Sequence, residues 1–279
     1  MNNIQKYLSK SLLATAVLLV SASPSWAQAP QNMASGFSVL GGTNVTCTSG
    51  VVAGDIGVAP GGAVPFTNTG CVISGATPPA TNTAAVQART DFLSAYAALQ
   101  LQTSSCTPVT GNLSGLNLSP GVYCLDAVAK EGTLTLTGPA NGVWVFLVNG
   151  ALTGTNFSVA MAGGDPCNVY WAPTAAATLT TSAFKGNILA GDAIDGSITL
   201  TGGSVAGSLL ANVAVTMTDA SVIGCDTLSG SRDKEHHKCN QGVGNGSEGC
   251  DPGHSDQHHS SNDENGGTPG NPGRKGGNR

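Results

Sequence analysis

The segments TTSAFKG (180–186), TGGSVAG (201–207) and TDASVIG (218–224) follow one pattern, Thr-x-x-x-(Val/Ile/Phe)-x-Gly. The pattern recurs as TSGVVAG (48–54) and TGCVISG (69–75), and as TGTNFSV (153–159) without the final glycine. Adjacent copies begin 21, 21 and 17 residues apart, as expected for one turn of a solenoid. We expect the apolar position to point into a core and the glycine to allow a tight corner. Chance recurrence in a Thr- and Gly-rich chain is the alternative, and the matched spacing argues against it.

Short strands dominate the sequence around these repeats. Glycines divide the middle of the chain into runs of about 4–8 residues. Residues 133–137 (TLTLT) and 143–148 (VWVFLV) have the β-branched and aromatic content of strands.

One segment, residues 81–102, predicts a helix. It has no internal Gly or Pro, Pro78 and Pro79 precede it, and Thr81, Asn82 or Thr83 would cap its start. Apolar residues recur in it at helical spacing, namely Val86, Leu93, Tyr96, Ala97 and Leu101. We expect this stripe to pack on one face of the sheet structure.

The first 27 residues read as a signal peptide. Lys6 and Lys10 supply the charge, residues 12–20 form an apolar run too short to span a bilayer, and Ser25-Trp26-Ala27 resembles a signal peptidase site. We therefore predict a mature start at Gln28 and an exported protein, secreted or displayed at the cell surface. An uncleaved anchor is the alternative. No later segment is long and apolar enough for membrane insertion.

The composition changes sharply at Thr227. Residues 232–237 are a charged and His-containing run, and Gly, Asn, Ser, Asp and Pro follow with almost no apolar residues. Such a segment cannot bury enough surface to offset its ordering entropy. We therefore predict a folded domain over residues 28–226 and a disordered Gly/Asn/His-rich tail over residues 227–279, with a cell surface or matrix as a partner for the tail.

Charged residues are rare in the folded part. Arg89, Lys130 and Lys185 are the only cations between residues 28 and 226. Without Lys6 and Lys10, 9 basic residues remain against 16 acidic ones, a net charge of −7. Nucleic acids are bound through basic surfaces, so this balance argues against a nucleic-acid partner.

Eight cysteines in an exported chain predict disulfides. Spacing alone does not choose among the pairings that eight cysteines allow. Pairing between neighbours is our hypothesis: Cys47–Cys71, Cys106–Cys124, Cys167–Cys225 and Cys239–Cys250. A reactive or metal-bound thiol is the alternative.

The residues of common catalytic sites are missing from the folded part. All five histidines, His236, His237, His254, His258 and His259, lie in the tail, so the domain has no imidazole for a Ser-His-Asp or Cys-His arrangement. The sequence also lacks a P-loop and a dinucleotide-binding fingerprint. We predict that the protein is not an enzyme and needs no cofactor.

Two weaker candidate sites have simpler explanations. Asp192 and Asp195 near Lys185 would supply the carboxylates of a sugar-cleaving enzyme, but the flanking Gly191 and Gly196 favour a turn. The His and Cys residues of the tail match no defined metal-ligand spacing, and no metal site is predicted.

Several blocks together resemble the bacterial and fungal ice-binding protein family, from about Phe37 to Gly224. They are FSVLGGTNVTCT (37–48), VAGDIGVAPG (52–61), AVQARTDFLSAYAAL (85–99), LSPGVYC (118–124), GVWVFLV (142–148), CNVYW (167–171) and FKGNILA (184–190), in this order. The resemblance implies a mainly β fold, a right-handed irregular β-solenoid with one long α-helix along its side. It also implies that the ice surface is the partner.

The resemblance also points to candidate residues, because the family carries a Thr-(Ala/Gly)-x-(Thr/Asn) motif on its ice-binding face. Residues 153–156 (TGTN) satisfy the motif, residues 201–204 (TGGS) come close, and residues 180–183 and 218–221 depart from it. The candidates for an ice-binding face are Thr153, Thr155, Asn156, Thr180, Ser182, Thr201, Ser204, Thr218 and Ser221. Thr48 and Thr69 have valine at the fourth position. Ordinary solvent-facing strand residues are the alternative interpretation.

Three functions follow as hypotheses. The first is a secreted antifreeze-like protein that adsorbs to ice and inhibits its growth or recrystallisation. The second is an extracellular adhesion or matrix scaffold of the same fold without ice activity, motivated by the degenerate motif and the appended tail. The third is an enzyme acting on polysaccharides, which would need a cleft at Asp192, Asp195 and Lys185.

Overall fold

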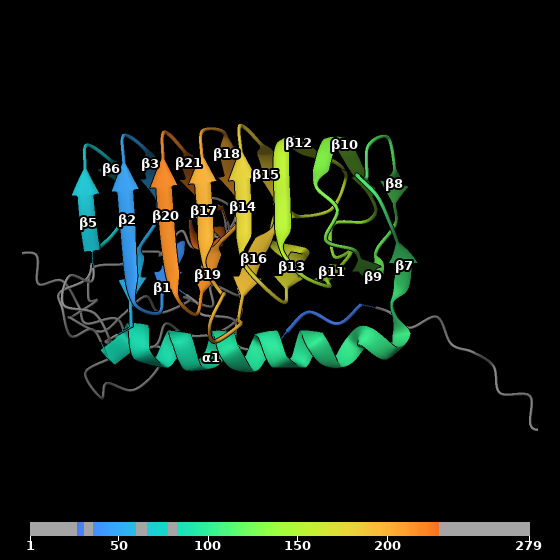
Figure 1. Cartoon of the computed structure of the whole chain (residues 1–279), viewed down its shortest axis with the longest axis horizontal. Helices are drawn as coiled ribbons and strands as arrows, with labels where there is room; N and C mark the ends of the chain where they lie inside the picture. The colour runs from blue at the N-terminus through green and yellow to red at the C-terminus, as the bar shows by residue number, and fades with distance from the viewer. Residues whose placement is uncertain (1–26, 31–35, 60–65, 78–82, 229–279) are drawn as a thin grey trace, which may run out of the picture.

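The computed structural model describes residues 27–30, 36–59, 66–77 and 83–228. Nearly all of the predicted signal peptide, the tail from residue 229 onward and the Cys239–Cys250 pair lie outside these residues. Parallel strands wind into a solenoid with a long helix along one side (Figure 1). The predicted mainly β solenoid with one flanking helix is therefore confirmed.

The first sheet forms one side of the solenoid, called face A here. It contains eight parallel strands in the spatial order β4 (Ile56–Val58), β1 (Val39–Gly41), β19 (Leu209–Ala211), β16 (Asn187–Ala190), β13 (Val169–Pro173), β11 (Trp144–Val148), β9 (Gly121–Leu125) and β7 (Thr107–Val109).

The second sheet has thirteen strands and folds over two further sides. Face B contains β5 (Phe66–Thr69), β2 (Asn44–Thr48), β20 (Ala214–Thr218), β17 (Ile198–Thr201), β14 (Ala177–Thr180) and the first part of β12 (Leu152–Ala162). Face C contains β6 (Val72–Ile73), β3 (Val51–Ala53), β21 (Ser221–Ile223), β18 (Ser204–Ala206), β15 (Ala183–Lys185), the second part of β12, β10 (Lys130–Thr137) and β8 (Asn117–Leu118). Strand β12 turns the corner between them, because β14 pairs with its start and β15 with Ser158.

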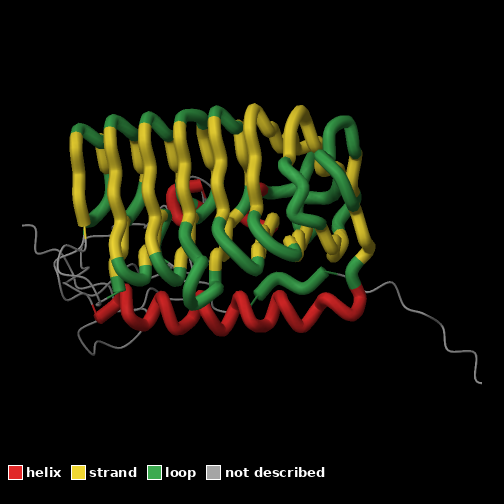
Figure 2. Tube along the Cα trace, in the orientation of Figure 1, coloured by secondary structure: helices red, strands yellow, loops and turns green. Residues whose placement is uncertain are grey.

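The order of the rungs in space differs from their order in the chain. The chain forms the rung β1–β2–β3, adds β4–β5–β6 at one end, and then crosses the whole length of the solenoid as a helix (Figure 2). From β7 it winds back rung by rung until β19, β20 and β21 pair with β1, β2 and β3. The fold is thus closed by pairing the N-terminal rung with the C-terminal one.

The flanking helix α1 (Thr83–Gln100) continues as a 3₁₀ turn, η1 (Leu101–Ser105). The helix prediction is confirmed, and the predicted contact stripe is correct only in part, because Leu93 and Tyr96 pack against the apolar cluster beneath the helix. Val86 and Leu101 are 41% and 81% exposed, while the fully buried positions are Ala85, Ala88, Phe92, Ala95 and Leu99. The helix is apolar on most of its surface, so spacing alone did not identify the stripe, and the alanines allow the close approach to face A.

The repeat identified in the sequence lies across the corner between faces B and C. Its apolar position is buried in five copies, at Val52, Phe157, Phe184, Val205 and Val222. It is half-buried at Ile73 in the end rung. The prediction that this position faces the core is therefore confirmed.

The closing glycine of the repeat lies where the backbone turns from face C toward face A. Gly207 has φ +148°, and a Cβ atom there would lie 2.1 Å from the carbonyl oxygen of Gly186. Only glycine fits this corner without moving the neighbouring rung.

Stacked aromatic rings and disulfides stabilise the interior. Phe146 and Trp171 stack with ring centroids 3.9 Å apart, and Phe184 lies 4.9 Å from Trp171. The structure contains Cys47–Cys71, Cys106–Cys124 and Cys167–Cys225, which confirms three of the four predicted pairings. A second 3₁₀ turn, η2 (Pro166–Asn168), contains Cys167.

Within the described ranges no helix has the length and hydropathy of a membrane span.

Candidate functional site

Face B carries the sequence Thr-x-Thr on each of six neighbouring strands. The six triplets, in spatial order from β5 to β12, are TNT (67–69), TCT (46–48), TMT (216–218), TLT (199–201), TLT (178–180) and TGT (153–155). Side chains alternate across a strand, so both threonines of a triplet point outward. The intervening Cys47, Met217, Leu200 and Leu179 are at most 2% exposed.

The strand register aligns these threonines into two straight rows. The first row contains Thr67, Thr46, Thr216, Thr199, Thr178 and Thr153, and the second contains Thr69, Thr48, Thr218, Thr201, Thr180 and Thr155. We call these twelve residues the threonine array. In Figure 1 the six strands lie side by side on the side of the solenoid that faces the viewer, and α1 runs below them without covering them.

The array has regular dimensions because they follow from the sheet itself. Neighbouring strands lie about 4.8 Å apart, and alternate side chains along a strand about 6.6 Å apart. Five strand spacings give a length of about 24 Å. Threonine is branched at Cβ, which restricts χ1, so each position presents a methyl group and a hydroxyl with few rotamers.

The hydroxyls of the array have no hydrogen-bond partner among the protein atoms of the described chain. Threonines elsewhere do, since Thr43 donates to the Val213 carbonyl and Thr137 donates to the Asn117 side chain. All twelve array side chains are half-buried or exposed. Their hydroxyls are therefore free to bond to water.

The array ends where the rung structure becomes irregular. Beyond β12, Lys130 of β10 pairs with Gly154, and the register then shifts before Gly132. Lys130 is fully buried, and its Nζ lies 2.8 Å from the Gly111 carbonyl oxygen and 2.9 Å from Asp126 Oδ1. The exposed Glu131 follows it. A buried cation and an exposed carboxylate thus replace the pattern that continues over six strands.

The edge of the array next to face C is a line of residues with positive φ. Asn156, Thr181 and Asp219 have φ values of +51°, +46° and +52°, and Ser49, Gly70 and Gly202 occupy the same place in their rungs. Thr181 Oγ1 donates to Asn156 Oδ1 across 2.6 Å. This left-handed corner ends each strand of face B directly after its second threonine.

The residues predicted for an ice-binding face separate into three groups. Thr153, Thr155, Thr180, Thr201 and Thr218 all belong to the array. Asn156 lies at the corner, and Ser204 and Ser221 lie on β18 and β21 of face C.

Ser182 requires a correction, because it is only 4% exposed. Its hydroxyl accepts from the Phe157 N–H and donates to the Thr180 carbonyl. It therefore stabilises the corner and presents nothing to solvent.

Seven residues of the array were missed by the sequence analysis. They are Thr46, Thr48, Thr67, Thr69, Thr178, Thr199 and Thr216. The signal that was available is a second threonine two positions before five of the six repeat copies, as in TCT, TNT and TMT. The four-residue family motif spans the corner and therefore combined outward residues of face B with residues of another side.

The carboxylates considered for catalysis form a turn. Asp192 Oδ1 accepts from the backbone N–H groups of Ile194 and Asp195 at 2.8 and 2.7 Å, which confirms the turn prediction. These backbone hydrogen bonds lower the pKa of Asp192 below its usual value. In the part of the chain that the structure describes, no group of three or more His, Cys, Asp or Glu residues has the arrangement of a metal site.

The fold and the array together define a β-solenoid protein with one bare, regular threonine face. Residues 37–223 match the model of the Ice-binding-like family. The chain belongs to this family.

Named relatives agree with this assignment. An ice-binding protein of Nostoc sp. (strain HG1) is 39% identical over 201 residues, which is 66% of this chain and 70% of the relative. Ice-binding protein K3-B1 of Typhula ishikariensis is 28% identical over 218 residues, 67% of this chain and 88% of the relative. The crystal structure of an ice-binding protein from the Antarctic ascomycete Antarctomyces psychrotrophicus superimposes with a TM-score of 0.60 at 30% identity, covering 68% of this chain and 95% of that one.

Proposed function

We propose that this protein binds ice through the threonine array and thereby inhibits ice growth or recrystallisation. The observation that carries the proposal is the alignment of twelve outward threonines in two rows on one uncovered face. The names of the relatives support it. The protein acts by adsorption, without breaking or forming a covalent bond.

The physical basis is a surface that orders water with little reorganisation. Each threonine offers a hydroxyl that bonds to water and a methyl group that does not, at a spacing fixed by the backbone. Since the side chains are already restricted, little conformational entropy is lost when water orders against them. Each contact is weak, but the contacts of a rigid array act together.

The low charge of the array supports the same function. All twelve positions of the array are neutral. Two charged residues lie at its borders: Asp219 directly after Thr218, and Glu131 directly after Lys130, which pairs with Gly154. Ionic groups hold water through strong, charge-assisted hydrogen bonds in their own orientations. A neutral surface avoids this competition.

The setting that we propose is extracellular. The leader would be cleaved after Ala27, and the disulfides Cys47–Cys71, Cys106–Cys124 and Cys167–Cys225 fit an oxidising compartment. The tail would then contact a cell surface or matrix.

The alternative, an adhesion scaffold without ice activity, was motivated by the degenerate four-residue motif. Thr-x-Thr is complete on all six strands of face B, and this regularity favours ice over adhesion.

The test is ice recrystallisation inhibition by the purified, oxidised protein. Thr199→Tyr places a bulky ring in the middle of the array and is expected to lower activity roughly tenfold or more, because the face no longer fits a flat surface. Ser204→Tyr is the matched control, since it adds the same ring to exposed face C on the same rung. Far-ultraviolet circular dichroism and thermal unfolding would show that both variants fold.

Two outcomes would contradict the proposal. A folded parent without activity at micromolar concentration would leave the adhesion scaffold as the better account. Equal loss of activity in the Thr199→Tyr and Ser204→Tyr variants would show that face B is not the binding surface.

A further inference from the structure

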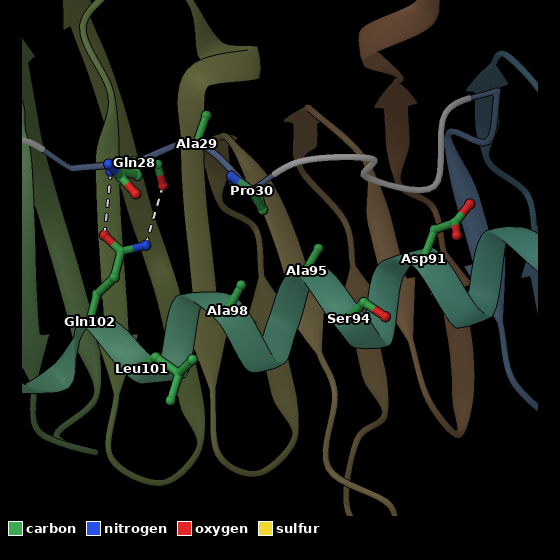
Figure 3. Close-up of a pocket in the computed structure, with 9 residues that line it drawn as sticks. All are labelled: Gln28, Ala29, Pro30, Asp91, Ser94, Ala95, Ala98, Leu101 and Gln102. Atoms are coloured by element: carbon green, nitrogen blue, oxygen red, sulfur yellow. Dashed lines mark hydrogen bonds between the residues drawn. The ribbon is translucent and has the colours of Figure 1, made fainter.

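The N-terminal segment of the described chain lies along α1. Gln28, Ala29 and Pro30 form one wall of a groove of about 890 Å³, and Ala95, Ala98 and Leu101 of the helix region contribute to the other (Figure 3). Ala29, which remains after cleavage behind Ala27, also packs against the apolar cluster between α1 and face A. This segment is thus docked on the helix.

The side chain of Gln102 forms hydrogen bonds with both the backbone N–H and the backbone carbonyl group of Gln28. The backbone nitrogen of Gln28 donates to Gln102 Oε1 at 3.3 Å, and Gln102 Nε2 donates to the carbonyl oxygen of Gln28 at 3.2 Å. Both interactions are drawn as dashed lines in Figure 3. The Gln28 residue as a whole is exposed, so its side chain is accessible.

The position of Gln28 in the sequence gives these contacts a chemical meaning. Gln28 follows the predicted cleavage site Ser25-Trp26-Ala27, so cleavage there would make its nitrogen the α-amino group of the mature chain. We propose that the side chain of Gln28 cyclises onto its own amino group to form a pyroglutamyl lactam, which Gln102 of η1 holds in place. The inference rests on the proposed cleavage after Ala27.

The reaction needs no partner other than the residue itself. The α-amino nitrogen attacks the side-chain Cδ of Gln28, and a nitrogen–carbon bond forms while the Cδ–Nε2 bond breaks. One proton passes from the α-amino nitrogen to the departing nitrogen, which leaves as ammonia. The product is a five-membered lactam with one N–H and no charge.

The lactam suits the observed contacts better than a free amine. Gln102 Oε1 is a single neutral acceptor, which matches the one N–H of a lactam, whereas an ammonium group has three protons and a positive charge. Among the residues lining the groove the carboxylate is Asp91, which accepts from Gln87 Nε2 at 2.8 Å and lies beyond Pro30 from Gln28 (Figure 3). The lactam keeps the N–H and the carbonyl group, so both hydrogen bonds to Gln102 persist.

The experiment uses the full chain, expressed with its leader in an exporting bacterium. The secreted protein is digested in the cold at neutral pH, and the N-terminal peptide is measured by mass spectrometry. We expect a peptide that begins at residue 28, is lighter by one ammonia, and does not react with an amine-labelling reagent. A synthetic peptide beginning with glutamine, carried through the same work-up, controls for cyclisation during handling. The Gln28→Ala variant should carry a labelled free amine.

Docking of the lactam is tested with a pyroglutamyl peptidase on the native protein. Removal of the lactam should be roughly tenfold faster in Gln102→Ala than in the parent, because the two hydrogen bonds that hold the segment are lost. Gln87→Ala, a change of another helix glutamine that does not contact Gln28, should leave the rate unchanged.

Three results would overturn the inference: a mature chain that begins elsewhere, a free amine at Gln28, or equal peptidase rates in the Gln102→Ala variant and the parent. Recrystallisation inhibition measured on the same samples keeps the two proposals separate. Gln28 packs against α1 and η1, whereas the array lies on face B, so failure of one proposal does not imply failure of the other.

Discussion

Faces A and B consist of strands from the same rungs, and they differ in what their outward side chains meet. On face A the outward residues are apolar and buried by α1, as at Leu40, Leu210, Leu189 and Val145. On face B the outward residues are the threonines of the array, and they contact solvent. The backbone supplies the same parallel ladder in both cases.

The two sides of this solenoid share a backbone and differ in role because their outward side chains differ. Covering face A removes apolar surface from water, which stabilises the fold by about 25 cal/mol for each Å². The outward residues of face B are half-buried or exposed and no other element covers them, so their identity is open to selection for binding. A change on face A is therefore expected to affect stability, and a change on face B to affect ice activity.

The largest effect is expected from Phe92→Ala. Phe92 is fully buried between α1 and face A, and truncating a buried Phe to Ala typically lowers the free energy of unfolding by about 3–5 kcal/mol. Thermal and denaturant unfolding would measure this loss. Recrystallisation inhibition, tested well below the new midpoint, should be unchanged. Loss of activity in the folded variant would show that packing on face A also determines ice activity on face B.

The next prediction compares the centre of the array with its end. Thr155 lies on β12, where the array ends, whereas Thr199 has two array rungs on one side and three on the other. Thr155→Tyr should therefore retain several times more recrystallisation inhibition than Thr199→Tyr, because more of the flat surface remains continuous. A dose–response series for both variants would measure the ratio. A larger loss at Thr155 would indicate that the β12 end of the array contributes more than its centre.

A smaller effect concerns the corner between faces B and C. Thr181 is β-branched and has φ +46°, a conformation that Asn adopts at less cost. Thr181→Asn should raise the free energy of unfolding by roughly 0.5–1 kcal/mol. Ice activity should stay the same, because Thr181 lies outside both rows. Destabilisation would show instead that the hydrogen bond from Thr181 to Asn156 outweighs the strain.

The smallest effect is expected from Glu131→Thr. This change removes the carboxylate at the end of the array next to Gly154 and adds a hydroxyl and a methyl group. Recrystallisation inhibition should rise by roughly twofold or less, since one contact joins twelve. Glu131→Gln is the matched control, because it removes the charge without adding threonine geometry. Equal gains in the two variants would assign the effect to charge alone.

The sequence by itself determined the properties that depend on local pattern. The repeat identified the buried positions Val52, Phe184 and Val222, because the alternation of side chains within a strand needs no information from other rungs. The helix predicted over residues 81–102 is observed at Thr83–Gln100. The hypothesis of pairing between neighbouring cysteines agrees with three disulfides of the structure.

Tertiary structure decided which threonines stand side by side. Thr48 on β2 comes from the N-terminal rung and Thr218 on β20 from the C-terminal one, and they are neighbours because the chain closes on itself there. The same long-range packing placed Ser182 inside and selected the alanine stripe of α1 for contact. Local pattern fixes whether a side chain points in or out. The pairing of distant strands, which depends on packing across the whole molecule, turns separate Thr-x-Thr triplets into one surface.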